Sequence, residues 1–222
     1  MKFIKISMIL TILFSIFGCT HDLRIKNIAT YQNLGYNQLN EKSTIGIIAD
    51  VDNLNHKKII RGVAEKLIKL NTTPILPYTY TNTHPVDYIV KININSNYKG
   101  SWVNYFIDFP GFLIWTPTWN GYIYKINHNV KITLIDGKTK QEISQFNIPL
   151  NFDVRQADID RTWIENSWFE CGAIAFVGGF FHTRYDEDVT AMVTNEVYYP
   201  IGRYIAEEIK NNIKINKYNK RR

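Results

Sequence analysis

Two long stretches of the chain alternate between apolar and polar residues with a period of two, which is the pattern of half-buried strands. They cover residues 122–136 and 142–154, and the turn sequence Asp136-Gly137-Lys138-Thr139 follows the first. Because an aspartate–glycine turn between alternating stretches is typical of a hairpin, the pattern predicts a long antiparallel pair. Its expected inward residues are Tyr124, Ile126, Val130, Ile132, Leu134, Phe146, Ile148, Leu150 and Phe152.

Shorter patterns on both sides predict the other elements. The acids at 186–188 favour the start of a last helix, in which Pro200 is expected to cause a kink or a second start. With 222 residues, one domain of mixed α/β (α+β) class is expected: a strand–helix–strand opening, a largely antiparallel sheet and C-terminal helices. The other predicted segments are a buried strand at 45–51, a helix at 53–71, an edge strand at 73–77 and an alternating strand at 87–98.

The N-terminus has the parts of an export signal. Lys2 and Lys5 precede an uncharged, mostly apolar run over Ile6–Phe17, and Gly18 then precedes Cys19. A helix of this length rises about 18 Å, which is too short for a hydrocarbon core of about 30 Å. The pattern therefore predicts a removed signal over residues 1–18 rather than a transmembrane anchor.

The sequence Ile16-Phe17-Gly18-Cys19 resembles the lipobox of bacterial lipoproteins. That resemblance implies cleavage before Cys19, acylation of its thiol with palmitate-type chains, and acylation of the new amino terminus. Thr20 stands where an Asp would favour the inner membrane, so the resemblance implies an outer-membrane location facing the periplasm. An ordinary signal peptide with a coincidental cysteine is the alternative.

The expected layout after the signal is a lipidated tether over 19–42, a single periplasmic α/β domain over 43–210 and a basic tail over 211–222. Over residues 43–155, the order of elements is similar to the N-terminal domain of TolB-type proteins and of the curli-secretion lipoprotein. No family motif matches residue by residue, so the similarity implies a fold and no site.

The charge is unevenly placed along the chain. The formal net charge is +6, but two basic residues lie in the signal and six lie between Lys210 and Arg222, where no acid occurs. The rest of the chain has 18 basic residues against 20 acidic ones. This balance excludes the basic face that a nucleic-acid partner needs. The basic end is solvated, or it is attracted to anionic lipid headgroups.

An aromatic stretch over 102–124 is unusual for a connection between strands, since connections normally carry polar residues. Trp and Tyr prefer the boundary between water and lipid, so the stretch predicts a surface for a membrane, an envelope partner or self-association. The alternative is a lid that buries its own rings. The expected contact residues are Trp102, Tyr105, Phe106, Phe109, Phe112, Trp115 and Trp119.

A second apolar segment, over 171–181, predicts a buried helix or, together with the first segment, a membrane-facing or oligomer-facing patch. The first and second segments together leave open an oligomeric pore or export component.

Catalytic motifs are missing from the sequence. The five histidines have no metal-ligand spacing, no phosphate-binding or nucleophile motif occurs, and we expect no metal, cofactor or catalytic residue. His128 alternates with apolar residues and is expected to be a hydrogen-bonded core histidine. An envelope hydrolase using the acidic cluster over 158–170, with Glu165 or Asp158 as base and His182 beside it, is the enzymatic alternative. The favoured interpretation is a lipid-anchored, non-catalytic envelope protein with a binding or scaffolding domain.

Overall fold

The computed structural model describes residues 22–32, 42–49, 53–81, 84–109, 111, 121–157, 176 and 187–219. The chain divides into two compact units. One comprises residues 1–26, 98–125 and 153–189, and the other comprises residues 27–97, 126–152 and 190–222. The long strands contribute residues to both units.

A six-stranded sheet in the order β1-β6-β5-β4-β2-β3 confirms the mixed α/β class. β2 is parallel to β3 and β4, as a strand–helix–strand opening requires, whereas β1 pairs with β6 in antiparallel orientation. The strands are β1 (Asp22–Lys26), β2 (Ser43–Ala49), β3 (Thr72–Ile75), β4 (Tyr88–Gly100), β5 (Tyr122–Asp136) and β6 (Glu142–Ala157).

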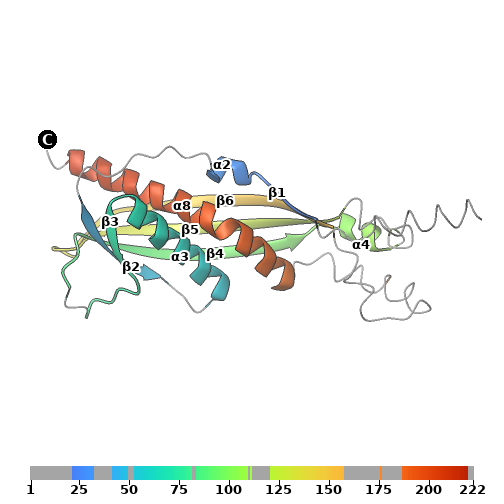
Figure 1. Cartoon of the computed structure of the whole chain (residues 1–222), viewed down its shortest axis with the longest axis horizontal. Coiled ribbons are helices and arrows are strands. Elements are labelled where there is room, and N and C mark those ends of the chain that lie inside the picture. The colour runs from blue at the N-terminus through green and yellow to red at the C-terminus, as the bar shows by residue number, and fades with distance from the viewer. Residues whose placement is uncertain are drawn as a thin grey trace, which may run out of the picture. The chain divides into compact units, whose positions relative to one another are not determined.

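Two helices, α3 (Leu54–Lys69) and α8 (Glu187–Asn219), lie side by side over one face of the sheet (Figure 1). The side chain of Asn53 caps α3 by accepting hydrogen bonds from two backbone N–H groups of its first turn. The helices cross closely where Gly62 meets Gly202. The even-numbered residues from Ile126 to Leu134 of β5 and from Ile148 to Phe152 of β6 are buried under this layer, as the alternation predicts.

A smaller core lies on the other face of the sheet. The ring of Tyr78 packs on Gly46 of β2, where an added Cβ would lie 2.5 Å from the ring. A side chain at that position is therefore excluded. Tyr78, Val86, Ile89 and Ile135 are buried together here, with Ile48 and Ile75 packed against them. The chain around Tyr78 and Val86 thus covers one end of this face, and the stretch along β4–β6 beyond it is exposed.

The ordered fold begins before the predicted start at Ser43. β1 pairs with β6, and α2 (Ile28–Gln32) carries Tyr31, which is buried against the rings of Phe152 and Tyr204. The prediction of a tether over 19–42 is therefore wrong for residues 22–32. It failed because five-residue elements carry too little periodicity to stand out from a polar, Asn-rich segment.

The C-terminal region also differs from the prediction. α8 continues through Pro200 to Asn219, and Ile213 is fully buried, so the basic tail over 211–222 is helical for most of its length. Pro200 was expected to kink the helix or to start a second one, and the structure has one helix that runs through it. The apolar residues that continue past position 209 at helical spacing, Ile213 among them, explain the extension.

Candidate contact surface

A short helix, α4 (Val103–Asp108), occupies the beginning of the predicted aromatic contact segment. Its inward side is fixed by Asn104, which is fully buried. The Asn104 side chain accepts a hydrogen bond from the backbone N–H of Ile123 at 2.7 Å and donates one to the Ile123 carbonyl at 2.9 Å. Ile107 is buried on the same helix. These contacts hold α4 against the first residues of β5 and determine which side of the helix faces solvent.

The outward side of α4 is apolar. Trp102, at the helix start, is 61% exposed, and Phe106, one turn later, is 56% exposed. Val103 is also exposed. The ring of Trp102 stacks on that of Tyr105 at a centroid distance of 5.8 Å, which orders the indole on the surface.

Phe176 extends this surface from a distant part of the sequence. Its ring lies 5.2 Å from that of Phe109 and 6.0 Å from that of Tyr105, and it is itself exposed. We call the set Trp102, Val103, Tyr105, Phe106, Phe109 and Phe176 the α4 surface. Exposed apolar side chains that lie in contact with one another mark interaction sites more often than scattered ones do.

The structure describes only some of the predicted contact residues. Trp102 and Phe106 are exposed, and Tyr105 and Phe109 are half-buried beneath them. Phe112, Trp115 and Trp119 lie outside the described residues, as does the lipidation site Cys19. Asn104 was not predicted, and Phe176 was expected to be exposed only in the alternative in which the second apolar segment, over 171–181, forms a patch with the first. For Asn104, the available signal was a polar residue among the apolar residues that begin the aromatic stretch.

A partly buried chain of polar side chains lies between α3 and the sheet. Ser96 Oγ on β4 lies 2.7 Å from Nδ1 of His128 on β5 and 2.9 Å from Nε2 of His56 on α3. Burial, with a smaller contribution from the nearby His56, lowers the pKa of His128 from 6.5 to about 4. His128 is therefore neutral at physiological pH, and its prediction as a hydrogen-bonded core histidine is confirmed. At 4% exposure the ring is closed to a substrate, so this serine–histidine pair is structural.

A charged group is also buried between the two long helices. Glu207 of α8 interacts with Lys210 of the same helix and with Lys66 of α3, whose Nζ lies 3.4 Å from Glu207 Oε1. All three side chains are at most 6% exposed. The contact between Lys66 and Glu207 links α3 to α8. Removal of one member of the group would leave an uncompensated buried charge and would therefore be destabilising.

Other chemistry is not assembled in the part of the chain that the structure describes. No three potential metal ligands come together within those residues. Nor does any described helix have the length and apolar character of a membrane span. The acidic cluster over 158–170 and His182, on which the hydrolase alternative depends, lie outside the described residues.

Comparisons with known proteins give structural likeness alone. No protein family and no curated protein matches this sequence. Rare lipoprotein B from Shewanella oneidensis has a similar structure at a TM-score of 0.39 and 12% identity, over 78% of this chain and 98% of that one. A minor lipoprotein from Acinetobacter baumannii is similar at a TM-score of 0.32 and 7% identity, over 70% of this chain and 92% of that one.

TolB from Acinetobacter baumannii, a protein of the type whose element order resembles this chain, is a weak match. Its TM-score is 0.27 at 11% identity, over 72% of this chain and 32% of that one. Bacterial lipoproteins therefore occur among the solved structures that this chain resembles, and at these TM-scores the likeness assigns neither a ligand nor a reaction.

Proposed function

We propose that this chain is a non-catalytic, lipid-anchored protein of the bacterial cell envelope, held by acyl chains on Cys19 and resting on the membrane through the α4 surface. The observation that carries the second half of this proposal is the two-sided character of α4. Its inner side is fixed by the buried Asn104, and its outer side presents Trp102 and Phe106 to solvent.

The lipid and the aromatic side chains have complementary roles in this proposal. A single acyl chain holds a protein only marginally, whereas two chains, or one chain with a second attraction, hold it stably. Trp and Phe rings at the headgroup level supply such an attraction and also orient the protein. A lipid attached at one point does not by itself determine which side of the protein faces the bilayer. The α4 surface would therefore decide which side of the protein faces the bilayer.

The size of the effect follows from the exposed area. At about 0.6 exposure, each of the two rings offers ~120 Å² of a side chain of ~200 Å². Full transfer of both to hydrocarbon is worth up to ~6 kcal/mol at ~25 cal/mol per Å², and shallow interfacial insertion roughly a third of that. About 2 kcal/mol corresponds to a roughly 30-fold change in partitioning.

The test compares full-length chains that all carry Cys19→Ala, so that no acyl group masks the protein's own affinity. Partitioning onto phosphatidylethanolamine–phosphatidylglycerol vesicles is measured by flotation. Trp102→Ser with Phe106→Ser is expected to weaken binding roughly 30-fold. The control is Ile68→Ser with Ile215→Ser, which removes apolar residues of similar exposure, 61% and 58%, from α3 and α8.

Because the leader is the same in all variants, a difference in vesicle partitioning between variants reports only the substituted side chains. Equal loss in both pairs would mean that any exposed apolar residue contributes, and no loss in the α4 pair would mean that α4 does not touch lipid. Either result contradicts the proposed role of the α4 surface.

A further inference from the structure

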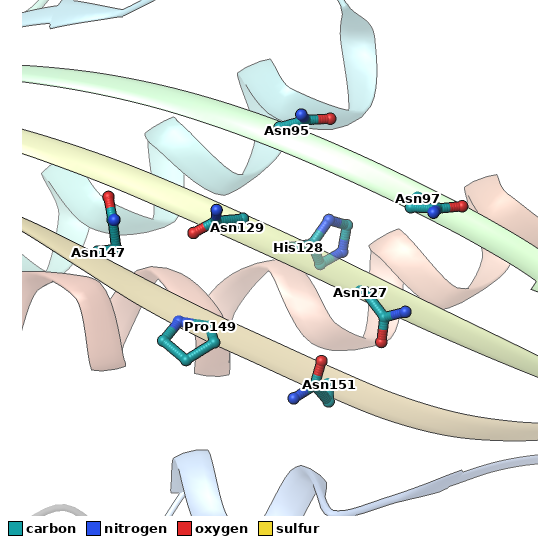
Figure 2. A pocket seen from close by; sticks show the side chains of 8 residues that line it. All are labelled: Asn95, Asn97, Asn127, His128, Asn129, Asn147, Pro149 and Asn151. Carbon is teal, nitrogen blue, oxygen red and sulfur yellow. The ribbon is translucent and has the colours of Figure 1, made fainter.

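Six asparagine side chains line one hollow on the sheet face that α3 and α8 leave uncovered. Figure 2 shows them on the near side of the strands, with the helices behind. All six are exposed, in contrast to the buried and half-buried residues that alternate with them. They are Asn95 and Asn97 of β4, Asn127 and Asn129 of β5, and Asn147 and Asn151 of β6. We call this set the amide face.

The register of β4 and β5 pairs these amides across the strands. Gly137 donates its backbone N–H to the Asp87 carbonyl at one end of the pair, and Ser96 meets His128 further along. Both contacts give the same register, which puts Asn95 opposite Asn129 and Asn97 opposite Asn127. Directly opposed residues have Cβ atoms about 5 Å apart, and same-face residues along a strand repeat about every 7 Å. The amides therefore form a grid.

The hollow above this grid has a volume of about 480 Å³, within the range of small-ligand sites. Pro149 of β6 adds an apolar ring to its lining. His128 is the one titratable residue in the lining, and its ring makes its contacts on the other face, with Ser96 and Phe152. The hollow thus offers neutral hydrogen-bonding groups and no fixed charge of its own.

The chemistry of the amide face selects its ligand. Each asparagine amide presents two donor hydrogens and an acceptor oxygen. A ligand that matches many such groups at short spacing must itself carry many groups that both donate and accept, without a net charge that would need a counter-ion. The hydroxyl groups of a sugar chain have this character, and the flat apolar side of a sugar ring suits Pro149.

Peptide binding by strand addition fits this part of the sheet poorly. β6 would have to receive the new strand at its outer edge, where Pro149 has no N–H to donate. The next outward N–H, that of Asn151, already donates to the hydroxyl of Tyr31 at 3.3 Å. The edge is therefore unsuited to pairing at Pro149 and Asn151, while the amide face beside it is open.

We propose that the amide face is a carbohydrate-binding site that takes a neutral, polyhydroxylated glycan chain. This inference does not depend on the lipid anchor or on the α4 surface. Binding through Asn95, Asn97, Asn127 and Asn129 requires only the register of β4 and β5. It predicts that the NMR signals of these side-chain amides shift when the ligand binds.

The test titrates maltohexaose, cellohexaose and chitohexaose into full-length chain labelled with ¹⁵N-asparagine. A detergent without a sugar headgroup, such as dodecylphosphocholine, avoids competition. Side-chain amide signals of the amide face are expected to shift with at least one oligosaccharide. Affinity for it is expected to fall at least tenfold in Asn127→Ala with Asn129→Ala. The control, Asn211→Ala, removes an exposed asparagine of α8 and should leave affinity unchanged.

Three results would overturn the proposal. The first is that no oligosaccharide shifts these signals at ~10 mM, a concentration that saturates even millimolar sites. The second is that shifts occur but affinity survives in the double variant. The third is that the signals move with protein concentration and not with sugar, which would assign the face to self-association. The wild-type titration stands by itself if the double variant does not fold.

Discussion

Replacing Gly202 of α8 with alanine is expected to destabilise the protein, although the same change in an exposed helix normally stabilises it by about 1 kcal/mol. A Cβ at this position would lie 2.4 Å from the carbonyl carbon of Gly62 and 2.6 Å from the backbone nitrogen of Val63. Both atoms belong to the backbone of α3, so no side chain can rotate away. The helices must separate, and overpacking of this kind costs about 1–3 kcal/mol. After the gain in helix propensity is subtracted, a net loss of up to about 2 kcal/mol is expected.

The assay is urea unfolding of wild type, Gly202→Ala and a matched control on the same helix. Asn211→Ala replaces an exposed residue, so it should be neutral or slightly stabilising. Gly62→Ala provides a second probe from the opposite helix, because its Cβ would lie 2.7 Å from the carbonyl oxygen of Tyr198. If Gly202→Ala were as stable as the control or more so, the close crossing of α3 and α8 would be refuted.

Two further predictions concern buried polar groups. Because the pKa of His128 is about 4 in the folded protein and 6.5 when unfolded, the unfolded state takes up a proton first as pH falls. The contribution of His128 to the free energy of unfolding is therefore at its maximum above pH 6.5. The free energy of unfolding is expected to drop by up to about 3 kcal/mol as pH falls to 4. His128→Gln should flatten that part of the pH profile, and a profile unchanged by the substitution would contradict the assignment. Asn104→Ala removes two hydrogen bonds to Ile123 from a buried position, and a loss of about 2 kcal/mol in urea unfolding is expected. An unchanged urea midpoint would show that α4 is held by other contacts.

Much of the fold was predictable because its long elements repeat one pattern. The hairpin of β5 and β6 alternates over more than ten residues per strand, so one buried face is enough to determine both the strands and their inward residues. The helix α3 was equally clear, since Asn53 caps a segment of helical spacing. Where the signal is local and repeated, tertiary contacts do not need to be known.

Other features depend on contacts between distant segments. β1 is a strand because Leu23 and Ile25 have β6 to pair with, and Tyr31 is buried because Phe152 and Tyr204 are there to receive it. The sequence near residues 22–32 contains none of that information. Likewise, Phe176 joins the α4 surface only in three dimensions.

The amide face shows a third case, in which the pattern was visible and its meaning was not. Alternation placed Asn93 and Asn95 on the polar side of their strand, as it would any solvent-facing residue. The same side of β5 and β6 also carries asparagines. These residues form one site only because the register of the strands places them side by side, with Asn97 opposite Asn127. Pairing between strands is set by turns and by the core, and not by the polar residues themselves.

In our proposal, a lipid on Cys19 fastens this protein to the cell envelope. The decisive experiment is mass spectrometry of the N-terminal peptide from the mature protein. We expect a mature chain that begins at Cys19 and carries the added mass of acyl groups on that residue. A peptide that still contains the leader, or one that begins elsewhere with an unmodified thiol at Cys19, would contradict it.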